Sequence, residues 1–388
     1  MIEISARLIR GSAFIAGEVV ECCITFSNPQ DPNHKISHGS NDVMETLALA
    51  SAQIHCQCTT NTKMIQTNSS TETDAPATNT STSFAPCESD SGYVVLSTKP
   101  KILFCDLRLA RGESKSFLYR ETLPCEAPPT YRGQAIKYSY KITIGTQRVN
   151  SAIKLLRVPL RVLVVNGVTD SSVCCNDSED LVPTNPFLET EKKDSPLEIS
   201  LHILQNVTAR RCPNFYNITN VHGKVVRFCL FKQAYKLGED IVGTFDFTDA
   251  TVPCVQYSVT LQSEEEVHPD HKRSVKQAPS VISYNKQHEM CLSWKYLQLI
   301  LPIPFHITPA FSTNLVSLQW RLHFEFVTST TPLSADDPPN DENEEKSSQG
   351  PSSLNIETMI WNLPIKILPT TPYLVGQSHQ ATKYSIVI

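Results

Sequence analysis

The sequence lacks the uninterrupted apolar run that a membrane-spanning helix needs. One long uncharged stretch runs from Tyr296 to Trp320, but it contains Pro302, Pro304 and Pro309. A spanning helix requires about twenty mostly apolar residues, and each proline would disturb it. The first residues, MIEISARLIRG, carry charges and alternate in polarity, unlike a secretory signal. We therefore expect a soluble, cytoplasmic protein.

A strong net charge and the common catalytic motifs are also missing. The 388-residue chain has a formal net charge of −5 and only short basic clusters, so nothing in it predicts nucleic-acid binding. It contains no Walker loop, no Gly-x-Gly-x-x-Gly and no Gly-x-Ser-x-Gly elbow. These absences predict that the protein is not an enzyme with a covalent-chemistry active site. They also predict no catalytic, cofactor-binding or metal-binding residue, and no cofactor.

Two clusters contain residue types that bind metals in other proteins. His55-Cys56-Gln57-Cys58 lacks the paired Cys-x₂₋₄-Cys spacing of zinc sites. Alternation along a strand would place Cys56 and Cys58 on one face, which favours packing in a core. The acidic and histidine-bearing run from Glu264 to His271 is interpreted as a charged loop. Without a secretory signal, the thirteen cysteines are predicted to be reduced and to act as small apolar side chains.

The sequence does contain a long-range repeat. Residues 13–26, AFIAGEVVECCITF, resemble residues 234–247, AYKLGEDIVGTFDF, with Gly-Glu and the final Phe at matching places. Glycine accepts the positive φ that a tight turn needs, and alternating apolar residues after it line one face of a sheet. Both segments are therefore predicted to be a turn that leads into a strand.

Three further elements recur in the same order. They are a Leu-Pro step at Leu123-Pro124 and Leu301-Pro302, a long alternating strand at 134–145 and 317–328, and a strand with an internal proline at 155–165 and 360–369. Helical periodicity is scarce, and turn residues punctuate the strands at short spacing. The pattern predicts an all-β protein of two tandem β-sandwich domains that arose by duplication.

Composition sets the predicted domain boundaries, because polar, Thr/Ser/Asn-rich or acidic stretches bury too little surface to order themselves. We predict a first domain at 1–165 with a disordered insertion at 59–90. A second domain is predicted at 201–370 with a disordered insertion at 328–353. An acidic linker at 166–200 joins them, and a flexible tail follows at 371–388. The last residues, YSIVI, are interpreted as a frayed end rather than a docking motif. The first half of residues 44–58 fits either a helical turn or a strand.

Several runs carry a family resemblance. They are ASAQIHCQ, PKILFCDLRLARGESKSF, YRGQAIKYSYKITIGTQRVNS, LLRVPLRVLV, YKLGEDIVGTF, WRLHFEFVTS and LPIKILPT. Together they resemble the Rgp subunits of the Ric–Rgp guanine-nucleotide exchange complexes. The similarity covers roughly residues 1–165 and 206–370. It implies an arrestin-like fold, which is itself two β-sandwiches in tandem.

The resemblance also implies a function. The chain would be a non-catalytic subunit of a heteromeric exchange factor that activates a Golgi Rab GTPase of the Rab-six class in retrograde endosome-to-Golgi transport. Its partners would be the large Ric subunit and the Rab, and it would be recruited to Golgi membranes through them. Exchange needs differential affinity for the nucleotide-free GTPase rather than covalent chemistry. The alternative is an arrestin-type cargo or receptor adaptor. The resemblance assigns no contact residue.

Overall fold

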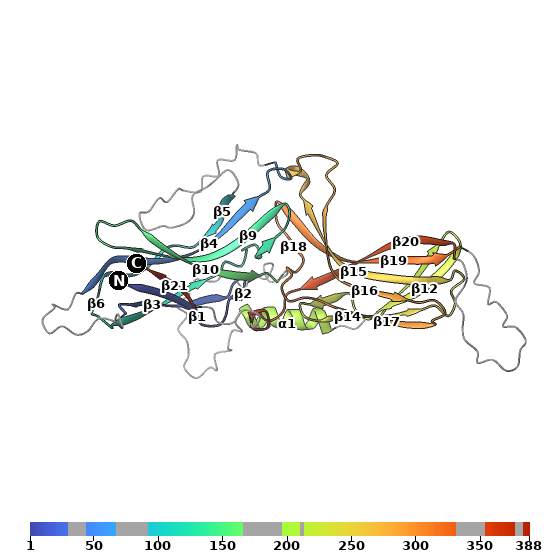
Figure 1. Cartoon of the computed structure of the whole chain (residues 1–388), viewed down its shortest axis with the longest axis horizontal. Helices are drawn as coiled ribbons and strands as arrows, with labels where there is room; N and C mark the ends of the chain where they lie inside the picture. Colours follow the sequence, from blue (N-terminus) through green and yellow to red (C-terminus); the bar gives the residue numbers. More distant parts are fainter. Residues whose placement is uncertain (30–43, 67–91, 166–195, 210–212, 331–353, 377–382) are drawn as a thin grey trace, which may run out of the picture.

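The computed structural model describes residues 1–29, 44–66, 92–165, 196–209, 213–330, 354–376 and 383–388. Two β-sandwiches lie end to end in an elongated molecule (Figure 1). Each sandwich packs a four-stranded sheet against a larger one. The predicted all-β class is confirmed. In the described part of the chain, no helix has the length and apolar character needed to cross a membrane.

The first domain contains two sheets. Its strands are β1 (Glu3–Leu8), β2 (Ala13–Ile15), β3 (Val19–Ser27), β4 (Glu45–Thr60), β5 (Gly92–Ser97), β6 (Lys101–Leu109), β7 (Ser114–Thr122), β8 (Tyr131–Arg132), β9 (Ile136–Gln147), β10 (Lys154–Leu163) and β21 (Tyr384–Val387). One sheet has the order β21-β1-β3-β7. The other has the order β2-β10-β9-β4-β5, with β6 also paired to β4 and β8 to β9.

The second domain repeats this plan. Its strands are β11 (Asn214–Asn220), β12 (Gly223–Leu230), β13 (Ala234–Lys236), β14 (Asp240–Asp246), β15 (Cys254–Val267), β16 (Ser280–Met290), β17 (Tyr296–Pro302), β18 (Phe311–Ser312), β19 (Val316–Ser329) and β20 (Ile356–Leu368). The sheets have the orders β11-β12-β14-β17 and β13-β20-β19-β15-β16, with β18 on β19. The strand positions correspond between the domains, as duplication predicts, with two differences: β21, from the end of the chain, takes the place of β11, and β5 and β6 together take the place of β16.

Strand register makes the correspondence exact to the residue. Pro159 of β10 faces Lys141 of β9, and Pro364 of β20 faces Arg321 of β19. On the other side of the same strands, His55 faces Lys141 and Gln262 faces Arg321. Lys141 and Arg321 thus occupy equivalent places, as do His55 and Gln262.

Alternation of apolar residues produces the long central strands β9 and β19. The predicted inward sets are all nearly inaccessible to solvent: Ile136, Tyr138, Tyr140, Ile142, Ile144, Leu318, Trp320, Leu322, Phe324 and Phe326. Burying one such side chain contributes roughly 1.5–3 kcal/mol. The apolar faces of these two alternating strands are therefore buried in the cores.

The repeated Gly-Glu pair forms one kind of turn at three places. Gly17, Gly112 and Gly238 have φ values of 90°, 81° and 82°, a region that favours glycine. The following glutamates each accept a backbone N–H from three residues earlier, with N···O distances of 3.0, 2.8 and 2.9 Å. The carboxylate satisfies a donor that the tight turn would otherwise leave unpaired. The motif is a determinant of the fold.

The internal prolines of β10 and β20 lie where no ladder bond is lost. The N–H groups of Arg161 and Lys366 point away from the central strand, to Ser12 and Gln233. Residues two apart in a strand point their N–H groups to the same side. Pro159 and Pro364 therefore lack an N–H only on the side away from β9 and β19, where strands tolerate proline.

The structure corrects several predicted boundaries. The predicted linker 166–200 ends in helix α1 (Pro196–Ala209), whose Leu204 is buried in the second core. Thr59 and Thr60 belong to β4, and Thr328 and Ser329 to β19, so both insertions begin later than predicted. The rest of each insertion and residues 166–195 lie outside the described residues.

Two further interpretations were wrong. The whole of residues 45–60 is strand, because β6 pairs with β4 from Glu45 to Ala52 and β9 pairs with it from Leu49 to Thr60, so the helical alternative fails. The tail 371–388 contains the short helix α2 (Pro372–Gly376) and β21, which pairs antiparallel with β1. Residues Ile2 and Ile388 exchange two backbone hydrogen bonds of 2.9 and 2.8 Å. The last residues are therefore an edge strand of the first domain rather than a frayed end.

Candidate interaction surfaces

The first predicted cluster, His55 to Cys58, lies in the middle of β4. Cys56 and Cys58 are buried in the first core, on one face as predicted. Burial raises the pKa of these thiols to about 12 and about 11, so they stay protonated near neutral pH. His55 is also buried, and its Nδ1 lies 3.3 Å from the Thr143 hydroxyl. These side chains pack and do not form an open site.

The acidic side chains of the second cluster, Glu264 to His271, have different partners and do not form one site. Glu264 forms an ion pair of 3.1 Å with Arg321, and Glu266 forms one of 2.9 Å with Lys272. Glu264 to Val267 belong to β15, so the charged-loop interpretation holds only from His268 onward. Among the described residues, no group of three or more His, Cys, Asp or Glu side chains is placed to hold a metal ion.

The remaining member, Glu265, joins the two domains. It is 2% exposed, and its carboxylate accepts backbone N–H groups of the first domain. The distances are 2.7 Å from Gln134, 3.1 Å from Ala135 and 3.4 Å from Ile136. Gly133 passes so close that a Cβ there would collide with the Glu265 carboxylate. The sequence predicted a charged loop at this residue, because nothing local indicates a partner some 130 residues away.

Other contacts reinforce the junction. The rings of Tyr131 and Phe311 meet edge to face at 5.0 Å. The Arg161 guanidinium donates to the Ile307 carbonyl at 2.8 Å, and the Thr308 hydroxyl donates to the Thr130 carbonyl at 3.2 Å. Each core also contains side chains from the other domain. The domains therefore form one packed body.

A groove opens on the side of the second sandwich, between β11 and β20. It has a volume of about 920 Å³. Phe215 and Ile360 are 58% and 59% exposed at its rims, and Tyr216, Met359 and Trp361 are half-buried along it. The His222 ring, in the turn that follows β11, lies 3.4 Å from the Glu357 carboxylate of β20. Exposed apolar patches of this kind mark interaction sites more often than scattered single residues do.

One rim of the groove is an unpaired strand edge. Strand β13 covers β20 only at residues Lys366–Leu368. The Lys366 N–H points away from β19, and residues two apart in a strand direct their N–H groups to the same side. The N–H and C=O groups of Thr358, Ile360 and Asn362 therefore also point away from β19. Within the described residues, no strand pairs with them. This edge can accept an added strand.

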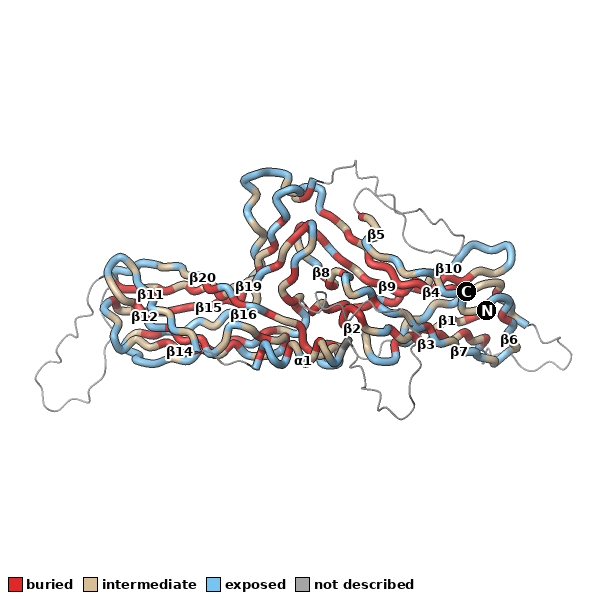
Figure 2. Tube along the Cα trace, turned by 180° about the vertical axis from the view of Figure 1, so that it is seen from behind, coloured by how far each residue is buried: buried red, intermediate tan, exposed pale blue. Residues whose placement is uncertain are grey.

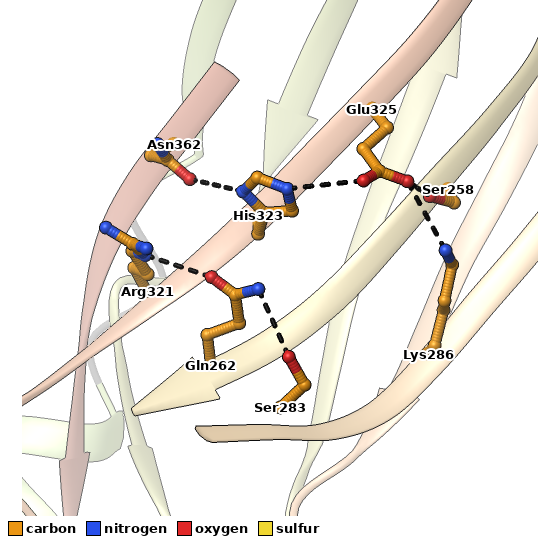
Figure 3. Close-up of polar contacts among 8 residues, drawn as sticks. All are labelled: Ser258, Gln262, Ser283, Lys286, Arg321, His323, Glu325 and Asn362. Atoms are coloured by element: carbon orange, nitrogen blue, oxygen red, sulfur yellow. Dashed lines mark hydrogen bonds and ion pairs between the residues drawn. The ribbon is translucent and has the colours of Figure 1, made fainter. Parts of the chain in front are cut away.

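The outer face of the second domain's large sheet is polar and internally satisfied (Figure 3). Glu325 accepts from Ser258 at 2.9 Å and lies 3.3 Å from the Lys286 ammonium. The His323 ring lies 2.7 Å from the Asn362 amide oxygen, and Arg321 donates to Gln262 at 3.1 Å. Charges on this face are matched across strands, so it offers little to an outside ion.

Known proteins resemble the chain along nearly its whole length. The Rgp1 family model matches residues 78–174 and 175–329. A human protein named RAB6A-GEF complex partner protein 2 is 46% identical over 385 residues, covering 97% of each chain. The cattle protein of that name is 46% identical over 375 residues, covering 94% of this chain and 93% of its own. The chain belongs to the Rgp1 family.

Membership of the Rgp1 family agrees with the resemblance expected from the sequence runs. Those runs lie mostly in strands that build the two cores and their turns. The Glu265 junction and the β11–β20 groove were not predicted. The signal for the groove is present in NFYNITN and IETMIW, which place aromatic and aliphatic residues on strand positions that later prove to be exposed.

Proposed function

We propose that this Rgp1-family chain is a non-catalytic subunit of a guanine-nucleotide exchange complex for a Golgi Rab GTPase of the Rab-six class, acting in retrograde transport from endosomes. The observation that carries the proposal is the 46% identity, over 97% of both chains, to a human protein named as a RAB6A-GEF complex partner. The tandem sandwiches support an arrestin-like scaffold that acts through its surfaces. The large Ric-type subunit and the Rab are its partners, and they recruit it to Golgi membranes.

Such a scaffold works through differential binding. A complex that binds the nucleotide-free Rab more tightly than the nucleotide-bound Rab shifts the equilibrium toward release of GDP. The rigid junction at Glu265 supports this role, because a scaffold that holds its partner in one orientation loses less entropy on assembly. The test is GDP release from the Rab with this chain and its large partner together. Failure of the pair to accelerate release would contradict the proposal.

We further propose that the large partner docks in the β11–β20 groove by adding a strand to β20. The exposed apolar rim gives side-chain contact, and the free backbone groups of Thr358, Ile360 and Asn362 give main-chain hydrogen bonds. The occupant is an extended, alternately apolar segment of the partner. Strand addition makes the binding depend on backbone N–H groups as well as on side chains.

Ile360→Pro tests this docking directly. Proline removes the N–H on the free edge and leaves the ladder to β19 intact, as Pro364 already does on the same strand. We expect co-purification with the partner to weaken by at least about tenfold, which corresponds to roughly 1.4 kcal/mol or one to two hydrogen bonds. Ile360→Val is the matched control, because it keeps the N–H, and should bind as the native chain does.

Equal binding of Ile360→Pro and Ile360→Val, both with native melting temperatures, would refute docking by strand addition. The arrestin-type adaptor predicts a different result: stable binding to receptor tails in the absence of any large partner.

A further inference from the structure

One long segment of the first domain contains only basic charges. Between Ala127 and Thr169 the sequence has seven Lys and Arg residues and no Asp or Glu, although the whole chain is net negative at −5. This segment forms β8, β9 and β10 of the large sheet, where β9 pairs with β10, β8 and β4 (Figure 1). Positive charge is therefore segregated on one part of an otherwise acidic protein.

Strand alternation places these cations on the outer face of that sheet. The inward residues of β9 are apolar, so Lys137 and Lys141 point outward, and Arg157 of β10 and Arg132 of β8 do the same. Arg132, Lys137 and Arg157 are exposed. Burial, followed by the neighbouring charges of Arg157 and Lys137, lowers the pKa of Lys141. The cations thus lie close enough to repel one another.

In the second domain, a carboxylate balances the cation at the position equivalent to Lys141. Arg321, which corresponds to Lys141, forms an ion pair with Glu264 at 3.1 Å. In the first domain the residue equivalent to Glu264 is Gln57, because Gln57 faces Ser139 as Glu264 faces Gln319. None of Arg132, Lys137, Lys141 and Arg157 forms an ion pair with a carboxylate of the described residues. The nearby Glu265 carboxylate is occupied by the N–H groups of Gln134, Ala135 and Ile136, so like charges are concentrated here with no ion-paired carboxylate among the described residues.

A cavity of about 470 Å³ opens beside this face, where β10 diverges from the ends of β8 and β9, and it reaches inward to Leu8 and Tyr384 of the other sheet. Arg132, Lys137 and Arg161 line it together with apolar surface from Leu8, Leu160 and Tyr384, and His306 reaches it from the second domain. Cations above apolar walls suit a ligand that has an anionic head and an apolar body. A phospholipid supplies both parts in one molecule, and a membrane presents many anionic heads to the whole face at once.

We propose that this basic face, formed by Arg132, Lys137, Lys141 and Arg157 around the cavity, docks directly on an anionic phospholipid membrane. Each cation near such a surface strengthens binding about fivefold at physiological salt, and the attraction falls off over roughly 8 Å. The membrane contact is then a property of this chain itself, in addition to recruitment through partners. It does not depend on the proposed exchange activity.

The test is co-sedimentation of the full chain with vesicles of phosphatidylcholine alone or of phosphatidylcholine rich in phosphatidylserine. We expect binding only to the anionic vesicles, and loss of that binding in high salt. The double variant Lys137→Glu, Arg157→Glu should bind at least roughly 30-fold more weakly, because two attractions of about fivefold each are lost and two repulsive charges are added. Arg7→Glu with Lys115→Glu is the matched control: both residues are exposed on the other sheet of the same domain, and the charge change is identical.

Three results would overturn the proposal. The first is a native chain that does not bind anionic vesicles. The second is a Lys137→Glu, Arg157→Glu variant that binds them as well as the control variant does. The third is a Lys137→Glu, Arg157→Glu variant that keeps vesicle binding but no longer binds a protein partner. The last outcome would assign the face to an acidic protein surface. A failed nucleotide-exchange assay with normal vesicle binding would count against the exchange function and leave this proposal standing.

Discussion

Single residues explain why two distant segments have almost the same sequence. The Gly-Glu turn needs a residue that accepts positive φ, followed by a carboxylate that reaches back to an N–H, and both halves retain that pair. This chemistry is local, so the sequence alone predicted the turns. Glu265 is the opposite case. Its partners belong to the other domain, and no local pattern distinguishes it from the exposed Glu266 beside it.

His55 makes the first domain sensitive to acid. Burial, then the charges of Lys141 and Arg157, lowers the pKa of His55 from 6.5 to about 4. In the unfolded chain the pKa returns to about 6.5, so between pH 7 and 5 only the unfolded chain takes up the proton. The free energy of unfolding therefore decreases as pH falls through this window, and it is about 2 kcal/mol lower at pH 5 than at neutral pH. The contribution is fully present above pH 6.5.

His55→Gln should remove that dependence, since glutamine is the residue at the equivalent position, Gln262, in the second domain. Urea unfolding of the whole chain at pH 7 and pH 5 measures it. His268→Gln, at an exposed site, is the control and should keep the native pH dependence. An unchanged loss of stability in His55→Gln would show that other groups cause the acid sensitivity.

Secondary-structure elements divide into those that the sequence predicted and those that depend on distant pairing. Alternation predicted β9 and β19, and the internal prolines of β10 and β20 were consistent with strands. Helix α1 was missed because its polar neighbours resemble a linker and only a narrow stripe around Leu204 is buried. Strand β21 was missed because four residues become a strand only when β1 supplies the other half of the ladder.

The pairing of β21 predicts a measurable contribution from the end of the chain. Ile386 packs against the first core, whereas Val387 is 55% exposed on the same strand. Ile386→Ala should lower the stability of the first domain by about 1–2 kcal/mol, below the full cost of a fully buried isoleucine because the site is half-buried. Val387→Ala should change it by less than about 0.5 kcal/mol. Thermal unfolding that is identical for the two variants would restore the frayed-end interpretation.

Considered as a whole, the molecule is two copies of one sandwich joined by a buried polar contact. Figure 2 shows buried segments running through both halves and meeting at the junction. Because Ala13 and Leu163 pack in the second core while Phe311 and Leu318 pack in the first, neither domain is complete without the other. This interlocking could not be predicted from the repeat, which indicates two similar units and not how they join.

Glu265→Ala tests the junction. The variant leaves the Gln134, Ala135 and Ile136 N–H groups without their acceptor in a buried place, which should cost about 2–4 kcal/mol. We also expect a broader distribution of interdomain distances, measured by fluorescence transfer between one label in each domain. Glu266→Ala, half-exposed and paired only with Lys272, should change stability by less than about 1 kcal/mol. A native distance distribution in Glu265→Ala would mean that the apolar contacts alone fix the two domains.

We propose that the chain promotes nucleotide exchange by binding its large partner at the open edge of β20. The most direct measurement is the rate of GDP release from a Rab-six-class GTPase at a fixed amount of the large subunit, titrated with this chain. The native chain should give a saturating curve, and Ile360→Pro a curve of the same plateau shifted at least about tenfold to higher concentration. A flat curve with the native chain, or full acceleration by this chain in the absence of the large subunit, would contradict the account.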